Sequence, residues 1–383
     1  MPFRLPVGLS GAGYRPHTLI RVSLFLAVPA IILWWVASSY FGGPSSLSGS
    51  KAPEFQGIHQ WLNSPPLTLA ELQGKVVLVD FWTYTCVNCI RTFPFIKDWN
   101  ARYSGDGLVI VGMHSPEFGF EKITENVASN ARDAGLVHPI AQDNDFATWN
   151  AYGNRFWPAK YLIDKDGVIR YTHFGEGKYR ETEKKIRELL EESGASVEDV
   201  PLGAPLVAAV RSSLASRGSA FGLTRELYGG YLRNNSQRAG YVSHSEYYEG
   251  PERVVEYLDP GGHKNHKIYL QGLWFNGLEA LQHARQSPGF EDYVGIKFSA
   301  ASVNAVVNPQ GNEPFQVRVT LDGRPLTQQE AGMDIEIEDG QSFFTVDEGR
   351  LYNLVSLPRL SGHELRLIPR SAGFALFAFT FGS

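Results

Sequence analysis

Cysteine is scarce in this sequence of 383 residues, which contains only Cys86 and Cys89. With no third cysteine, structural disulfides within the chain are excluded, so the two thiols act together or with thiols of a partner. A surplus of basic charge is also absent. The formal net charge is −5, and without a basic stripe the chain is not expected to bind nucleic acid. Hydrophobic residues make up 43% of the sequence, enough for two or three domains with buried cores.

Charged side chains are missing from Val22–Phe41, a mostly apolar run long enough for one helix to cross a bilayer. Three arginines precede this run, and the first charge after it is Lys51. The positive-inside rule therefore predicts a single-pass protein of the cytoplasmic membrane, with its N-terminus inside and its catalytic domains extracytoplasmic, or periplasmic. A cleaved signal peptide, cut near Ala37–Ser39, is the alternative. We favour the anchor because the apolar run and the segment before it are long for a signal.

The next part of the chain alternates predicted strands and helices, which indicates an α/β sheet. Val76–Val79 and Leu108–Val111 are continuous apolar runs, typical of parallel strands covered on both faces. Helices are predicted over 86–103, 120–134 (capped by Gly135) and 181–192. A stretch rich in Ala, Ser, Gly and Pro follows, with room for one short helix at 206–217.

The last part of the chain has a different pattern. Apolar and polar residues alternate over 316–321 and 333–338, and each segment is followed by an Asp-Gly pair. Short alternating strands with such turns are typical of an antiparallel β-sandwich or barrel. We therefore predict a cytoplasmic tail (1–17), a transmembrane anchor (18–41), a tether (42–52), an α/β domain (53–193), a linker (194–222) and a β-sandwich domain (223–383).

The two cysteines lie where a predicted strand turns into a predicted helix. A helix N-terminus carries partial positive charge and favours a thiolate, so Cys86 is expected to be the exposed nucleophile. Cys89 lies one turn further along and could resolve a mixed disulfide. Half of a zinc site is the alternative, but a structural site needs four ligands. Because no second cysteine pair exists and the histidines are scattered, we expect neither a metal nor a cofactor.

The run Asp80-Phe81-Trp82, followed by Cys86-Val-Asn-Cys89, resembles the thioredoxin superfamily. The longer segment from Trp82 to Cys89 is similar to the redox domain of DipZ-type and other TlpA-like membrane-tethered thioredoxins. Pro94 matches the proline that kinks the family's helix, and Trp157-Pro158 matches its cis-proline position. The resemblance implies an α/β thioredoxin-like domain. It extends less specifically to the C-terminal part, where it implies an all-β sandwich similar to carbohydrate-binding modules.

The resemblance also implies roles for individual residues. Cys86, Cys89 and Asp80 are the predicted catalytic residues, with Asp80 as a buried proton acceptor for Cys89. The alternative for Asp80 is a carboxylate bonded to backbone at a strand end. Trp157, Pro158 and Trp82 are the predicted substrate-binding residues. A cis bond at Pro158 would present the backbone of Trp157 to an extended substrate segment, whereas Trp82 could equally be core packing.

The leading functional prediction is a thiol–disulfide oxidoreductase that reduces or isomerises disulfides in exported proteins. Because this sequence has one hydrophobic span where DipZ-type proteins have a polytopic part, its electrons would come from an integral-membrane thiol donor of the CcdA or DsbD kind. A thiol peroxidase is one alternative, since Thr83 lies three residues before Cys86. Another is a carbohydrate- or protein-binding module with an accessory redox domain. Its candidate ligand contacts are the aromatic residues Tyr228, Tyr231, Tyr247, Tyr248, Trp274 and Phe275.

Overall fold

A computed structural model describes residues 47–201, 203, 222–236, 240–286, 288–311 and 313–383 of the chain. The predicted membrane span Val22–Phe41 and the predicted helix at 206–217 lie outside these residues. Among the helices that are described, none combines the length and apolar character needed to cross a membrane.

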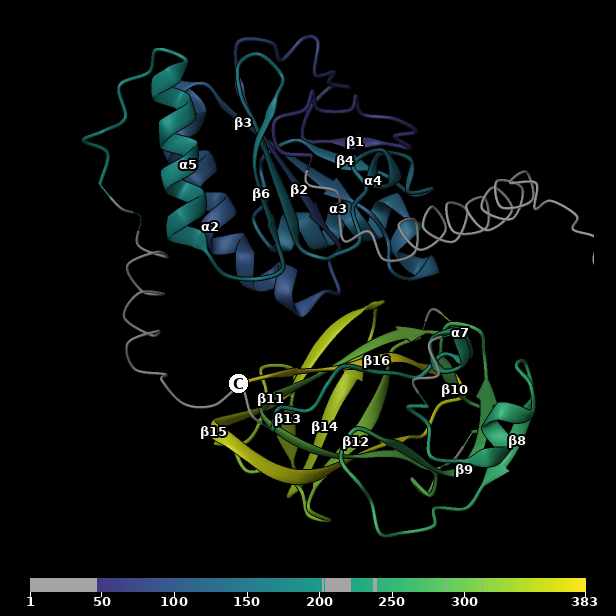
Figure 1. Cartoon of the computed structure of the whole chain (residues 1–383). Helices are drawn as coiled ribbons and strands as arrows, with labels where there is room; N and C mark the ends of the chain where they lie inside the picture. The colour runs from purple at the N-terminus through teal and green to yellow at the C-terminus, as the bar shows by residue number, and fades with distance from the viewer. Residues whose placement is uncertain (1–46, 202, 204–221, 237–239, 287, 312) are drawn as a thin grey trace, which may run out of the picture. The chain divides into compact units, whose positions relative to one another are not determined.

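The α/β domain is built on a mixed sheet with β2 near its centre (Figure 1). β2 pairs in parallel with β3 and antiparallel with β5. The apolar runs predicted as buried strands are therefore confirmed as the two central parallel strands. In spatial order the strands are β1 (Trp61–Leu62), β4 (Ile140–Gln142), β3 (Leu108–His114), β2 (Val76–Trp82), β5 (Ala159–Ile163) and β6 (Ile169–Phe174).

Successive residues of β2 enter two different cores, because side chains of a strand alternate between the faces of its sheet. Val76 and Leu78 pack with α2 (Val87–Tyr103) and α5 (Tyr179–Glu192), which lie side by side in Figure 1. Val77, Val79 and Phe81 pack in the core that includes α4 (Ala147–Ala151). Burial on both faces explains why β2 is a continuous apolar run with one exception, Asp80.

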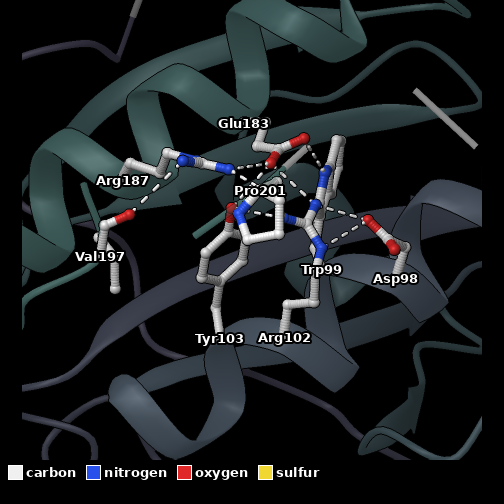
Figure 2. A network of polar contacts seen from close by, with 8 residues as sticks. All are labelled: Asp98, Trp99, Arg102, Tyr103, Glu183, Arg187, Val197 and Pro201. Carbon is white, nitrogen blue, oxygen red and sulfur yellow. Dashed lines mark hydrogen bonds and ion pairs between the residues drawn. The ribbon is translucent and has the colours of Figure 1, made fainter. Parts of the chain in front are cut away.

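A polar network joins α2 to α5 at the end of α2 remote from the cysteines (Figure 2). The Glu183 carboxylate accepts hydrogen bonds from Tyr103 (2.7 Å), Arg102 (2.8 Å) and Arg187 (2.9 Å). Trp99 Nε1 donates to the second Glu183 oxygen at 3.3 Å. Arg102 also donates to the carbonyl of Pro201, so the chain that follows α5 is held to the same network.

The segment between β3 and β4 differs from the single helix predicted over 120–134. It forms a 3₁₀ turn, η2 (Gly119–Lys122), and then α3 (Thr124–Asp133), separated by Ile123 in an extended conformation. Gly135 has a φ of 66°, as expected for the glycine that ends the helix. A second 3₁₀ turn, η1 (Ser104–Asp106), connects α2 to β3.

The C-terminal domain is mainly antiparallel β-structure, as predicted, with one short helix and one 3₁₀ turn in the described residues. In the described residues its strands form one continuous sheet, in which β11 pairs with β9 over Tyr293–Ile296 and with β16 over Ser302–Pro309. The elements are β7 (Leu227–Tyr228), α7 (Tyr231–Ser236), η3 (Ser245–Glu249), β8 (Val254–Tyr257), β9 (Ile268–Asn276), β10 (Leu281–His283), β11 (Tyr293–Pro309), β12 (Phe315–Leu321), β13 (Glu336–Glu338), β14 (Gln341–Val346), β15 (Arg350–Pro369) and β16 (Phe374–Gly382).

Both predicted Asp-Gly turns are present, since Asp322, Gly323, Asp339 and Gly340 all have positive φ. The strand predicted over 333–338 is shorter than expected, because only β13 (Glu336–Glu338) is extended and paired. Met333 is 88% exposed. The Ile335 N–H closes a turn on the carbonyl of Gly332, so the alternating pattern there does not mark a half-buried strand.

Candidate functional site

Cys86 and Cys89 occupy the N-terminus of α2, directly after the turn that leaves β2. Cys86 is the residue that caps α2, and its Sγ accepts a hydrogen bond from the Cys89 N–H at 3.2 Å. The two Sγ atoms are 2.7 Å apart. Cys86 is partly exposed, whereas Cys89 is fully buried. The predicted geometry is therefore present, with an accessible thiol at the positive end of a helix and a second thiol beneath it.

Burial gives Cys89 a different chemistry from its partner. Desolvation, followed by the hydrogen bond and charge of Cys86, raises the pKa of the Cys89 thiol well above its ordinary value. A thiol must lose its proton before it can attack a disulfide. If Cys89 is to attack a mixed disulfide, a neighbouring base must therefore accept its proton.

Asp80 lies in β2, six residues before Cys86, and is 2% exposed. Burial raises the pKa of the Asp80 carboxyl, and the charge of Lys160 opposes that rise. Lys160 Nζ is 3.0 Å from Asp80 Oδ1, because the antiparallel register of β2 and β5 places the two residues opposite each other. Neither atom has a further hydrogen-bond partner among the described residues. This environment agrees with the proton-acceptor role predicted for Asp80, which stays a prediction.

The Trp157–Pro158 peptide bond is cis, as predicted, and lies immediately before β5. The Trp157 indole is partly exposed, and its Nε1 donates to the carbonyl of Ser115 at 3.0 Å. It also packs against Trp149, with ring centroids 4.3 Å apart. Pro158 is two residues from Lys160, so the strand that begins at the cis bond also carries the partner of Asp80.

Two roles were left open for Trp82, substrate contact and core packing, and its burial favours core packing. Its side chain is 1% exposed and packs edge-on against Phe93 and His114, with ring centroids 5.4 and 5.1 Å away. Trp82 therefore fills the core beneath the turn, because the strand that carries it is buried on both faces.

Three buried polar residues of the site were missed from the sequence: Lys160, His114 and Glu121. Lys160 could have been noticed as a lysine in an otherwise apolar strand. His114 ends β3, and burial lowers its pKa to about 3, so it is neutral. Glu121 accepts a hydrogen bond from Thr85, the residue before Cys86, at 2.6 Å. Its role could not be read from sequence, because it depends on how two loops meet.

The residues proposed for the alternative functions are mostly buried. Thr83, which a peroxidase would use to bind peroxide, is fully buried, and its hydroxyl lies 3.4 Å from His114 Nε2. Six aromatic residues were considered for sugar stacking. Tyr228, Tyr247 and Trp274 are at most 8% exposed, whereas Tyr231, Tyr248 and Phe275 are partly exposed. Stacking on a sugar ring needs an exposed aromatic face, so these three are core residues.

Comparison with known proteins gives two matching family models: "Redoxin" over residues 47–190 and "Thioredoxin like C-terminal domain" over residues 224–382. The chain is 35% identical over 335 residues to Protein DipZ of Mycobacterium tuberculosis, an alignment that covers 86% of this chain and 43% of DipZ. The chain therefore spans less than half the length of this relative.

A shorter relative is covered almost completely. The thiol-disulfide oxidoreductase YkuV of Bacillus subtilis is 30% identical over 142 residues, which are 37% of this chain and 95% of YkuV. Among solved structures, a thiol-disulfide isomerase from Corynebacterium glutamicum matches 36% of this chain and 96% of its own, with 23% identity and a TM-score of 0.34.

Proposed function

This chain belongs to the redoxin family of thioredoxin-like proteins, and from that premise we propose that it is a thiol–disulfide oxidoreductase that reduces or isomerises disulfides in exported proteins. The observation that carries the proposal is the arrangement of one accessible and one buried thiol, 2.7 Å apart, at the N-terminus of α2.

The first step of the proposed reaction uses the exposed thiol. The Cys86 thiolate attacks one sulfur of a substrate disulfide, which forms a mixed disulfide and releases the other substrate sulfur as a thiolate. The cis bond at Trp157–Pro158 lies at the start of β5, where an extended substrate segment would pair with the backbone of Trp157.

The second step uses the buried pair. Asp80 accepts the Cys89 proton, and the Cys89 thiolate then attacks Cys86 Sγ. This attack forms the Cys86–Cys89 disulfide and releases the substrate as a dithiol, reduced by two electrons. Lys160 would balance the charge of Asp80 from 3.0 Å. Net reduction requires two electrons from a dithiol donor to restore the enzyme.

The location and the electron donor are part of the same proposal. The apolar run Val22–Phe41 supports a membrane tether with the catalytic domain outside the cytoplasm. An integral-membrane thiol donor of the CcdA or DsbD kind would then meet the redox site at high effective concentration. Fractionation of the full-length protein, with mass measurement, tests the tether: a soluble form beginning near Tyr40 would identify a cleaved signal instead.

For the C-terminal domain we propose a sandwich-like fold and a role in protein contacts rather than in carbohydrate binding. The support is that three of its six aromatic candidates, Tyr228, Tyr247 and Trp274, are buried. Binding of the full chain to immobilised glycans would contradict this role.

The function is tested by trapping and by redox titration. Cys89→Ser is expected to accumulate mixed disulfides with exported proteins, and Cys86→Ser is not. A reduction potential near that of thioredoxin, about −270 mV, would agree with a reductant. A potential near about −120 mV would instead indicate an oxidant and would overturn the proposed direction.

A further inference from the structure

Glu121 is buried beside the redox centre, yet it takes no part in the reaction described above. Its side chain is 0% exposed. It belongs to η2, which follows β3, whereas Cys86 follows the adjacent parallel strand β2. The two loops therefore leave the same edge of the sheet.

The Glu121 carboxylate connects these loops. One oxygen accepts from Thr85 Oγ1 at 2.6 Å and lies 3.4 Å from the Thr85 N–H. The other oxygen accepts from the N–H groups of Glu117 at 2.5 Å and Phe118 at 3.0 Å. Both oxygens therefore act as acceptors, and the N–H groups of Thr85, Glu117 and Phe118 can only donate.

The loop on the far side of this carboxylate is itself anchored. Phe118 and Phe120 both pack against Phe377 of β16, with ring centroids 5.0 and 4.8 Å away. Glu117 accepts from Arg233 at 2.7 Å. Thr85 is therefore tied to a segment that is fixed by several contacts.

We propose that Glu121 is a positioning residue for thiol–disulfide exchange: it fixes Thr85, and through Thr85 the backbone that presents the Cys86 sulfur. Residues 83–85 lead directly into the helix cap, so a change in the conformation of Thr85 displaces Cys86. A displacement of about 1 Å at a reacting atom can cost up to about a hundredfold in rate.

The protonation behaviour of Glu121 agrees with this role. Burial raises its pKa to about 7, and hydrogen bonds from Thr83, Thr85 and the Phe118 N–H oppose the rise. The cost of burying the carboxyl is thus partly offset by donors from both loops. A glutamine would keep the size, but its amide N–H₂ could not accept the hydrogen bonds that one of the two loops now donates to the carboxylate.

The test compares Glu121→Gln, Thr85→Val and Thr85→Ser in the reduced full-length protein. The readout is the rate of Cys86 reaction with a small aromatic disulfide, which requires no protein docking. We expect Glu121→Gln and Thr85→Val each to slow this reaction about tenfold. Thr85→Ser keeps the hydroxyl and should restore most of the rate. The matched control is Glu125→Gln, an exposed glutamate of α3.

The double variant decides whether the two residues act as one contact. Glu121→Gln with Thr85→Val should be no slower than the slower single variant, because both break the same hydrogen bond. The proposal is wrong if Glu121→Gln behaves like Glu125→Gln, if Thr85→Ser is as slow as Thr85→Val, or if the effects multiply. If Glu121→Gln does not fold, the comparison of Thr85→Val with Thr85→Ser still tests the proposal. Because the probe is a small disulfide, the result is independent of whether exported proteins are the substrates.

Discussion

One buried charged cluster joins α2 to α5 and another joins β2 to β5, and the two are built in opposite ways. Around Glu183, four side chains donate to one carboxylate (Figure 2). Around Asp80, one lysine faces one carboxylate, and neither contacting atom has a further hydrogen bond among the described residues. Burial raises the carboxyl pKa at both sites. The hydrogen bonds from Tyr103, Arg102 and Arg187 reverse that effect at Glu183, whereas Lys160 only reduces it at Asp80.

This difference distinguishes a carboxylate that stabilises the fold, Glu183, from one that can take part in the reaction, Asp80. A carboxylate with many donors stays ionised and holds elements together, because every protonation would break a hydrogen bond. A carboxyl with one partner and a raised pKa can change its protonation state during a reaction. The cluster that joins α2 to α5 should therefore affect stability. The pair of Asp80 and Lys160 should affect turnover, because the charge of Asp80 acts on Cys89.

The largest expected effect is on turnover. Asp80→Asn should lower the rate of disulfide reduction by about a hundredfold, because Cys89 loses its proton acceptor. The measurement is steady-state reduction of a protein disulfide, with thermal unfolding to show that the variant is folded. Glu183→Gln serves as the control and should stay within about twofold of the parent rate. If both variants lose the same activity, the separation between the two clusters does not hold.

The reverse effect is expected for stability. Glu183→Gln should lower the free energy of unfolding by about 2 kcal/mol. The reason is that the amide N–H₂ of the glutamine would face side chains that now donate to the carboxylate. Urea unfolding measures this loss. The exposed Glu181→Gln, on the same helix, should change stability by less than about 0.5 kcal/mol. Equal free energies of unfolding for the two variants would show that the network around Glu183 does not stabilise the fold.

A smaller effect on turnover is expected at Lys160. The charge of Lys160 lowers the pKa of Asp80, so Lys160→Met should raise that pKa. We expect turnover at pH 7 to fall about fivefold and to recover partly as the pH rises. Carboxyl-carbon NMR of Asp80 follows the shift directly. A pH profile identical to that of the parent would remove Lys160 from the proton-handling site.

The smallest expected effect is a change in the pH dependence of stability. The pKa of Glu183 is lowered from 4.5, so its stabilisation is complete above about pH 4.5 and is lost as the pH falls through the folded-state pKa. The pKa of Asp80 is raised from 3.8. Its contribution therefore has the opposite sign, and stability declines as the pH rises from about 4 toward its folded-state pKa.

Unfolding of the parent and of Glu183→Gln between pH 3 and 6 measures the first of these contributions. The difference between them should shrink as the pH drops below about 4.5. A difference that is constant across this range would show that Glu183 has no lowered pKa in the folded state.

The parts of the fold that sequence predicted are those with a local cause. Val76–Val79 is a buried strand because of its own apolar run, and Cys86 caps a helix because the turn and the periodic residues after it are contiguous. The pairing of Asp80 with Lys160 depends on the register between β2 and β5, which an apolar run does not specify. Glu121 was placed inside a predicted helix, and its role appears only once Ile123 interrupts that helix.

The cap of α2 has a consequence for detection of the reaction. The Cys89 amide donates to the same sulfur that reacts, Cys86 Sγ. When that sulfur is held in a mixed disulfide, it is a weaker acceptor than a thiolate, so the first turn of α2 loses part of its cap. Amide hydrogen exchange at Cys89 should then accelerate while exchange at the other end of α2 stays slow. Amide exchange at Cys89 should thus report, without a label, the fraction of the enzyme that is held as the mixed disulfide.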